Sequence, residues 1–197
     1  MTPATPSLPP YAHVNEQAVQ CIADASVRYE VPELLLHAVL RKENGRTGQA
    51  VRNANGTYDM GLAQINTVWV PHFAKYGVKL EHLLYDPCTN LQAAAYILKD
   101  NAIKFKGDWF RAIVAYNIGP SNWTPNRYGV GYRYASEVVR YWWGFQNWVD
   151  ANRGVARPVV PSYAGPQVYQ PTQEVLRANE QIVSTPPVVE TEKPSRP

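Results

Sequence analysis

The sequence predicts a single, mainly α-helical domain that carries a small β-hairpin and has proline-rich ends. Three observations support this prediction. Apolar residues recur at helical spacing through most of residues 11–154. One polar stretch, RNANGTYDM at 52–60, contains an Asn-Gly turn signal that is typical of a hairpin. Four prolines fall within 1–10 and eight within 155–197, so we expect both ends to be extended or disordered.

Composition argues against several classes of protein. The net charge is only +3 and the basic residues form no run, so a nucleic-acid-binding protein is not expected. No apolar stretch approaches the roughly 18 residues that a membrane span needs. The four histidines show no metal-ligand spacing and are predicted to be structural; they are His13, His37, His72 and His82. We therefore expect neither a metal ion nor a cofactor.

Helix signals divide the middle of the chain. Asn15 can cap a first helix, and Pro32 suits the first turn of a second helix that Gly45 ends. Asp86, followed by a proline, begins a long helix, and Asp108 caps the next one. The predicted helices span residues 16–30, 32–44, 87–105, 109–117 and 132–150.

The two cysteines and the N-terminus leave alternatives open. Cys21 and Cys88 are far apart and form no CxxC pattern, so spacing alone permits either two buried thiols or a disulfide. The first ten residues lack the charged and apolar regions of a secretory signal. The protein is then either cytosolic or a chain from which a leader has been removed.

Glu43 departs most from the expected pattern. It lies three, four, seven and eight residues after Leu40, Val39, Leu36 and Leu35, so all five share one helix face. A charge is unusual at the end of such an apolar stripe. Either the last turn frays and Glu43 lies in water, or its carboxyl is half-buried with a raised pKa.

Three short segments belong with this glutamate. They are Glu-Asn-Gly at 43–45, Gly-Leu-Ala-Gln-Ile-Asn at 61–66 and Ala-Tyr-Asn-Ile-Gly at 115–119. Together they resemble the family 1 lytic transglycosylases, lysozyme-like enzymes that cleave the glycan strands of peptidoglycan. The likeness covers about 20–150, and it implies a lysozyme-like α+β fold with the hairpin beside the cleft.

The chain departs from the family pattern at two positions and resembles one branch in particular. Asn44 replaces the usual serine, and Ala63 replaces the frequent methionine. The stretches RNANGTYDMGLAQIN and DPCTNLQAAAYI are most similar to a branch associated with type IV secretion and conjugation, type IV pili or type III secretion. In that branch a cysteine pair resembling Cys21 and Cys88 is usually a disulfide, so the resemblance implies a bridge.

The resemblance makes Glu43 the catalytic acid, and elementary chemistry supports that role. A general acid must remain protonated near neutral pH, whereas a free glutamate has a pKa near 4.3. Burial against the apolar stripe and the negative end of the helix dipole both raise this pKa. Lysozyme illustrates the same tuning. Glu43 would protonate the glycosidic oxygen and then deprotonate the sugar's C6 hydroxyl, giving a 1,6-anhydromuramoyl end.

Further residues are assigned to the cleft by their positions in the motifs. The resemblance assigns substrate contacts to Gln64, Asn66, Tyr116 and Asn117, with Tyr116 near Glu43 or the reacting sugar. Leu62 and Ile65 are expected in the core. Trp123 and Tyr128 lie in a predicted loop beside the cleft, where either ring could stack on a sugar. Trp142, Trp143 and Trp148 share one predicted helix and are expected to pack in the core rather than to stack on a sugar.

Asp59 carries an alternative. The stretch around it is also similar to the hairpin of c-type lysozymes, in which an aspartate provides a second carboxylate. Two carboxyls about 5 Å apart would suit a retaining hydrolase. Asp59 could instead only pin a turn by accepting backbone N–H bonds. We expect it to assist Glu43 in an enzyme that remains a transglycosylase.

Three functions follow. The leading one is a monomeric, periplasmic or secreted enzyme that opens peptidoglycan locally for a secretion or conjugation apparatus. The second is a hydrolytic muramidase that uses Glu43 and Asp59. The third is a scaffold that holds glycan without cleaving it. The tail at 155–197 is either a passive linker or a segment that binds proteins of the apparatus.

Overall fold

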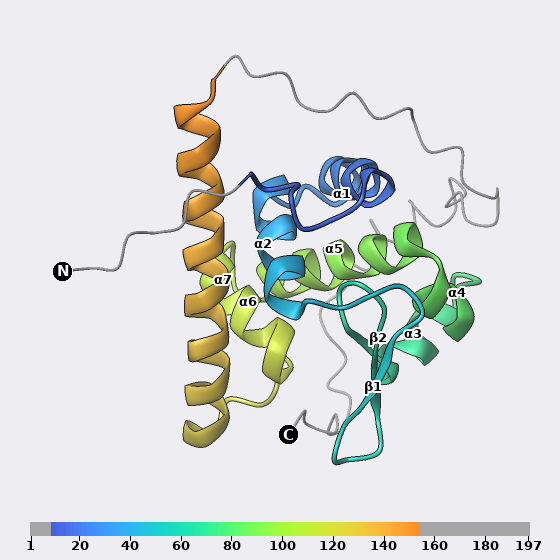
Figure 1. Ribbon diagram of the computed structural model, residues 1–197. Coiled ribbons are helices and arrows are strands. Elements are labelled where there is room, and N and C mark those ends of the chain that lie inside the picture. The colour runs from blue at the N-terminus through green and yellow to red at the C-terminus, as the bar shows by residue number, and fades with distance from the viewer. Residues whose placement is uncertain (1–8, 154–197) are drawn as a thin grey trace.

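The computed structural model describes residues 9–153 and confirms a mainly α-helical domain with a small sheet (Figure 1). The predicted tail at 155–197 and residues 1–8 of the predicted leader lie outside the described residues. In chain order the helices are α1 (Glu16–Tyr29), α2 (Glu33–Glu43), η1 (Thr67–Trp69, a 3₁₀ turn), α3 (Val70–Ala74), α4 (Leu80–Tyr85), α5 (Pro87–Lys104), α6 (Trp109–Ile118) and α7 (Pro125–Ala151).

The first helix begins where it is predicted, the second begins one residue later than predicted, and both end one residue early. The Asn15 side chain accepts the Ala18 N–H at 2.9 Å and caps α1 as predicted. Glu30 and Asn44 both adopt the left-handed conformation, with φ of 51°, and end α1 and α2. Asparagine tolerates this conformation well. Asn44, rather than the predicted Gly45, therefore stops α2.

The long helix α5 is joined to α1 by a disulfide. Cys21 and Cys88 are bonded, with their Cα atoms 5.0 Å apart, so the bridge implied by the family resemblance is present. The Asp86 side chain caps the same end of α5 by accepting the backbone N–H of Cys88 at 2.9 Å. The first turn of α5 is thus held both covalently and by its cap.

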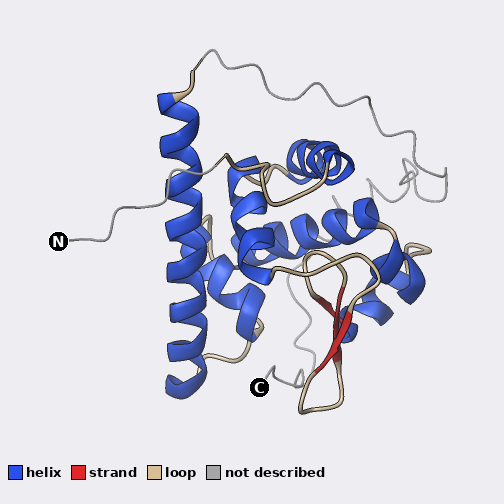
Figure 2. Ribbon diagram, in the orientation of Figure 1, coloured by secondary structure: helices blue, strands red, loops and turns tan. Residues whose placement is uncertain are grey.

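The core lies between α1, α2, α5, α6 and α7, and the sheet packs at one side of this helical body (Figure 2). Ile65 is buried as predicted, and Leu62 packs against the core while remaining partly exposed. The largest fully buried apolar side chains are Ile22, Val31, Leu35, Leu36, Val39, Met60, Ile65, Leu83, Leu91, Leu98 and Ile113.

The sheet is larger than the predicted hairpin. Its antiparallel strands, in the order β1-β2-β3, are β1 (Ala50–Arg52), β2 (Tyr58–Met60) and β3 (Ile65–Asn66). The predicted Asn-Gly turn lies in the loop between β1 and β2, where Gly56 has a φ of 85°. β3 escaped prediction because two residues are too few to show the alternation of a strand. It places part of the second motif segment inside the sheet.

The last helix begins seven residues earlier than the predicted 132. Thr124-Pro125 forms its start, with the proline in the first turn. Gly129 and Gly131 make the sequence before 132 look unfavourable for a helix. The structure explains Gly131: a Cβ atom there would lie 2.8 Å from Val114 of α6. Close contact between α6 and α7 therefore requires this glycine.

The three tryptophans of α7 do not behave alike. Trp142 packs partly buried against the core, and Trp148 makes an edge contact with Tyr11 at 5.6 Å between ring centroids. Trp143 is 63% exposed, so its predicted core position is wrong.

Among the helices of residues 9–153, none combines the length and apolar character needed to cross a bilayer.

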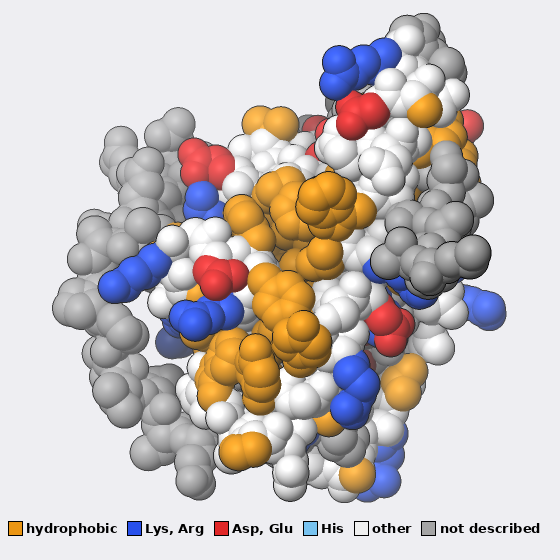
Figure 3. Space-filling view, turned by 90° about the vertical axis from the view of Figure 1, so that its left-hand side faces the viewer, with side chains coloured by type: hydrophobic (Ala, Val, Ile, Leu, Met, Phe, Trp, Pro, Cys, Tyr) orange, Lys and Arg blue, Asp and Glu red, His pale blue; other side chains and the backbone are white. Residues whose placement is uncertain are grey.

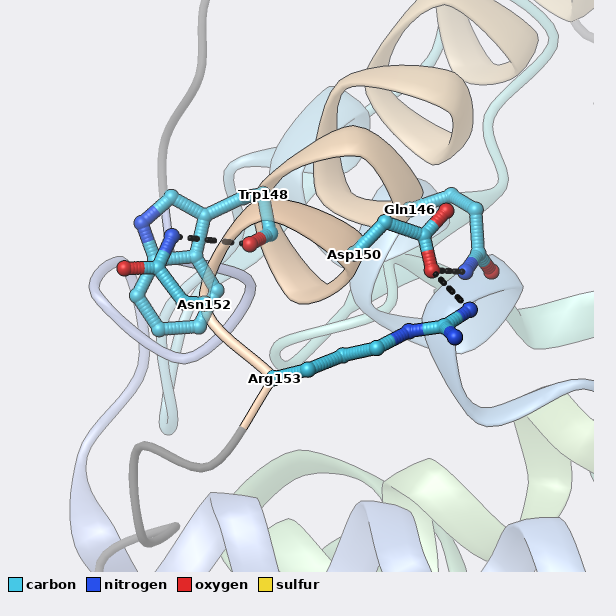
Figure 4. A network of polar contacts seen from close by, with 5 residues as sticks. All are labelled: Gln146, Trp148, Asp150, Asn152 and Arg153. Atoms are coloured by element: carbon cyan, nitrogen blue, oxygen red, sulfur yellow. Dashed lines mark hydrogen bonds and ion pairs between the residues drawn. The ribbon is translucent and has the colours of Figure 1, made fainter.

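Local polar contacts close the end of α7 (Figure 4). The Asn152 side chain donates to the carbonyl of Trp148 at 2.8 Å. Asp150 accepts hydrogen bonds from Gln146 at 3.2 Å and from Arg153 at 2.9 Å. The Asn152 side chain thus adds a second hydrogen bond at the Trp148 carbonyl, which also accepts the Asn152 backbone N–H at 3.0 Å, and the bonds to Asp150 link side chains only.

Candidate active site

Glu43 is the last residue of α2 and is half-buried. The four side chains predicted to share its face are all buried, with exposed fractions of 4% or less: Leu35, Leu36, Val39 and Leu40. The carboxyl thus extends an apolar stripe, as the spacing predicts, and the last turn does not fray into water. The raised pKa of Glu43 stays a prediction.

A hydroxyl from α7 meets this carboxyl. Tyr134 donates a hydrogen bond to Oε1 of Glu43 at 2.6 Å. The tyrosine ring is only 6% exposed, and Nζ of Lys42 lies 5.9 Å from its centroid. Lys42 is itself paired with Glu137 of α7 at 2.6 Å. Glu43 and Lys42 therefore both contact α7, which holds the end of α2 in a defined position.

Sequence reasoning missed Tyr134. It lies four residues before Val138 and eleven before Phe145, and all three are buried on one face of α7. A hydroxyl on an apolar helix face needs a polar partner. That signal was present, but the partner could be found only once α2 was known to pack against α7.

The three motif segments come together in space. A Cβ atom on Gly45 would lie 2.1 Å from the Gly61 carbonyl oxygen and 2.8 Å from Nε2 of Gln64, so only glycine fits there. Tyr116 reaches the same segment from α6 and donates a hydrogen bond from Oη to the Ala63 carbonyl at 2.8 Å. The segment at 61–66 thus lies between the end of α2 and the end of α6.

Gln64 is almost fully buried in this contact. It is 7% exposed, has a φ of 52°, and donates from Nε2 to the Gly61 carbonyl at 2.8 Å. Its amide lies against Gly45, two residues beyond Glu43. The predicted contact of Gln64 with a sugar stays a prediction, and the structure adds a packing role beside the acid.

Asp59 is held by a neighbouring strand. It is half-buried on β2, opposite Asn66 of β3, and Asn66 donates from Nδ2 to Oδ1 of Asp59 at 2.7 Å. The Asn66 amide also donates to Thr57 at 3.0 Å, and its oxygen accepts the Val68 N–H at 3.0 Å. Asn66 therefore links the hairpin to η1 and orients the second carboxyl.

A groove beside the end of α6 gathers three of the predicted substrate contacts. Its lining includes Asn66, Trp69, Tyr116, Asn117, Pro120 and Asn122. The Asn122 side chain donates to the Ile118 carbonyl at 2.7 Å and shapes the loop after α6. The site thus offers a carboxyl acid at the end of α2 and a groove of amide, hydroxyl and aromatic groups that suits an amino-sugar polymer.

Trp123 and Tyr128 lie at the edge of this region. Trp123 donates from Nε1 to the Pro120 carbonyl at 2.7 Å, and its ring lies 5.6 Å from that of Tyr128. Tyr128 was predicted in a loop, but it lies in the first turns of α7 because that helix begins early. It is 40% exposed. Both rings support the loop whose residues line the groove.

The four histidines all lie in the part of the chain that the structure describes. Within residues 9–153, no group of three or more histidine, cysteine or acidic side chains is placed to hold a metal ion. His37 is buried in α2, and His13 stacks on Phe145 at 5.7 Å. Burial, helped by the charge of Arg41, lowers the pKa of His13 to about 4.

Comparison with known proteins gives consistent matches. A family model described as "Transglycosylase SLT domain" matches residues 20–133. Invasion protein IagB of Salmonella typhimurium is 32% identical over 126 residues, which cover 64% of this chain and 76% of that protein. X polypeptide of Escherichia coli is 34% identical over 145 residues, or 72% and 81% of the two chains. Protein IpgF of Shigella flexneri is 33% identical over 121 residues, or 61% and 77%.

Proposed function

Because the chain belongs to the transglycosylase SLT domain family and is a peptidoglycan lytic transglycosylase, we propose that Glu43 cleaves the β-1,4 bond between N-acetylmuramic acid and N-acetylglucosamine. The observation that carries this proposal is the half-buried carboxyl at the end of an apolar helix stripe, with the Tyr134 hydroxyl 2.6 Å away. Such surroundings suit an acid that must give up and regain a proton.

The reaction needs one carboxyl in two protonation states. Glu43 first protonates the glycosidic oxygen, so that the bond from this oxygen to C1 of the muramic acid breaks. The acetamido carbonyl of the same sugar stabilises C1. The Glu43 carboxylate then removes the proton of the C6 hydroxyl, whose oxygen bonds to C1 and closes the 1,6-anhydro ring. Glu43 ends protonated, and no water is consumed.

Tyr134 assists the intermediate stage of this cycle. A hydrogen bond donated to a carboxylate favours the charged form, whereas burial favours the neutral acid. The hydroxyl therefore stabilises Glu43 after it has lost its proton, when it must act as a base. It also fixes the direction of the carboxyl, and correct placement of reacting groups is a large part of catalysis.

The groove beside α6 provides the binding surface in this proposal. Asn66, Tyr116 and Asn117 line or border it and supply the polar groups, with Gln64 beside the acid. Trp123 and Tyr128 add ring surface at its edge. Aromatic faces and amide groups together suit N-acetylated sugars, which have both apolar C–H faces and polar substituents.

A hydrolytic muramidase is the second candidate, and one observation favours it. Asp59 is a half-buried carboxyl that Asn66 orients at 2.7 Å. In a retaining hydrolase such a group would attack or stabilise C1 while water completes the reaction. Glu43 would remain the acid in that scheme, so the product, rather than the loss of activity, separates the two functions.

We also place the enzyme outside the cytoplasm, where its substrate lies. The Cys21–Cys88 disulfide supports this location, because such bonds persist in oxidising compartments. The likeness to the branch associated with secretion and conjugation supports a role in opening the wall for such an apparatus. In that role the sequence at 155–197 would bind apparatus proteins.

Mass spectrometry of muropeptides released from purified sacculi tests the proposal. We expect products one water lighter than hydrolytic ones, ending in 1,6-anhydromuramic acid, and at least about a hundredfold slower release by Glu43→Gln. Glu33→Gln, at the other end of α2, is the control that should release wild-type amounts. Products with a reducing muramic acid end would favour the muramidase. Undiminished release by Glu43→Gln would remove Glu43 from catalysis.

A further inference from the structure

Asn90 is a buried polar residue in the second turn of α5. It is 1% exposed, and its side chain makes three hydrogen bonds. Nδ2 donates to the carbonyls of Met60 at 2.9 Å and Leu83 at 2.7 Å. Oδ1 accepts the backbone N–H of Ala63 at 2.8 Å. A single amide therefore holds both ends of the turn that begins the second motif segment.

The turn fits against Asn90 without space for a side chain. A Cβ atom on Gly61 would lie 2.4 Å from Nδ2 of Asn90 and 2.8 Å from the Leu83 carbonyl oxygen, and Gly61 has a φ of 69°. On its other side the Gly61 carbonyl abuts Gly45 and accepts the hydrogen bond from Gln64. Asn90, Gly61 and Gly45 thus form successive packed layers that end two residues from Glu43.

Covalent and polar contacts fix the place of Asn90 itself. Cys88, two residues earlier, is bonded to Cys21 of α1. Asp86 accepts the N–H of Cys88 and the hydroxyl of Thr89, the latter at 2.8 Å. The turn of α5 that precedes Asn90 is therefore the one that the disulfide holds against the helical body.

We propose that Asn90 is a positioning residue of the active site, and that the Cys21–Cys88 disulfide supports catalysis through it. The disulfide fixes the start of α5, Asn90 carries that position to the turn at 60–63, and the turn sets Gln64 and Gly45 beside the acid. The inference rests on the proposed function, because it gives Asn90 a part in the cleavage by Glu43.

The test compares two buried asparagines of one helix. Asn101 is also fully buried in α5, but it lies about three helical turns beyond Asn90, and its amide donates to the Ala112 carbonyl of α6 at 3.4 Å. Steady-state rates on solubilised glycan strands are measured at a temperature where circular dichroism shows each variant folded. We expect Asn90→Ala to lower kcat roughly ten- to hundredfold with KM little changed, because small misplacements of reacting groups are costly.

Asn101→Ala should keep kcat within about twofold of the wild type, even if its melting temperature falls as far as that of Asn90→Ala. Asn90→Asp covers the case in which Asn90→Ala does not fold. It keeps the volume and the acceptor for Ala63 but sets oxygen against two carbonyls, so we expect the same fall in kcat. Wild-type kcat in a folded Asn90 variant, or equal losses in both asparagine variants, would overturn the proposal.

The disulfide step is tested by a double-mutant cycle. Replacing Cys21 and Cys88 together by serine should lower kcat severalfold in the wild-type background and much less in Asn90→Ala. In that variant the amide that joins the start of α5 to the turn at 60–63 is already missing. Fully additive losses would show that the disulfide acts elsewhere. These rate ratios do not depend on the product formed, so a hydrolytic product would overturn the proposed function while leaving this comparison intact.

Discussion

Glu43 and Asp59 are two half-buried carboxyls held by different kinds of structure. Glu43 ends an eleven-residue helix packed along α7, and its partner Tyr134 belongs to the longest helix of the described domain. Asp59 lies on a three-residue strand, and its partner Asn66 lies on a two-residue strand. The first carboxyl is held by a large apolar body, and the second by a small network of polar side chains. Because its surroundings hold it more firmly, we expect Glu43, rather than Asp59, to carry out the proton transfers that need exact placement of a carboxyl.

The largest expected effect on kcat comes from replacing each of the two carboxyls in turn. We expect Glu43→Gln to lower kcat by about 10²- to 10⁴-fold, the range of general acid–base catalysis. Asp59→Asn keeps the volume and should cost about tenfold or less if Asp59 only assists. Release rates of muropeptides measure both. Equal losses in the two variants would contradict the asymmetry and favour a two-carboxylate mechanism.

The stability of the helical body should also depend on pH, through His13. Its folded-state pKa of about 4 lies below the usual 6.5, so the unfolded chain binds more protons between these values. The contribution of His13 to the free energy of unfolding should therefore fall as pH drops from 6.5 to 4, by at most about 3 kcal/mol, and His13 adds no further loss below that window.

Denaturant titrations across this range check the prediction. His13→Phe keeps an aromatic ring against Phe145 and should remove most of the pH dependence. His82→Gln, on α4, is the matched control and should retain it. A slope that persists in His13→Phe would assign the acid sensitivity to other groups.

A smaller effect is expected from Tyr134→Phe, which removes one hydroxyl. Loss of its hydrogen bond disfavours the carboxylate and so raises the pKa of Glu43. Activity requires the protonated acid, so the fall of kcat/KM on the alkaline side should move to higher pH, while kcat falls roughly tenfold. Tyr132→Phe, an exposed tyrosine of the same helix, should change neither. An unshifted profile in Tyr134→Phe would show that the hydroxyl only packs.

Capping chemistry explains how much of the fold could be predicted. Helices that begin at Asn15, Asp86 and Asp108 were located correctly, because each cap is a local interaction. The start of α7 was missed because Gly131 is unfavourable for an isolated helix and is required only by the contact with α6. The strand β3 and the helices α3 and α4 are too short for periodicity to show.

The same distinction between local and tertiary interactions decides which residues of the active site could be predicted. Glu43 could be identified from sequence because a charge on an apolar stripe is visible within one helix. Tyr134 and Asn90 are equally out of place on their own apolar faces, but each is explained by a partner on another element. A buried polar group predicts that a partner exists and leaves its identity to tertiary structure.

We expect the smallest effects on activity from substitutions on the outer face of α7, where apolar side chains form a band (Figure 3). Tyr128 and Trp143 are exposed on this helix by 40% and 63%, but only Tyr128 contacts the loop beside the groove, through Trp123. Tyr128→Ala should raise KM for glycan strands by about two- to fivefold, since one lost ring contact is worth about 0.5–1 kcal/mol. Trp143→Ala should leave KM unchanged and stability within about 0.5 kcal/mol. Equal KM values in the two variants would confine substrate binding to the groove itself, whereas a larger effect of Trp143 would extend it along the band.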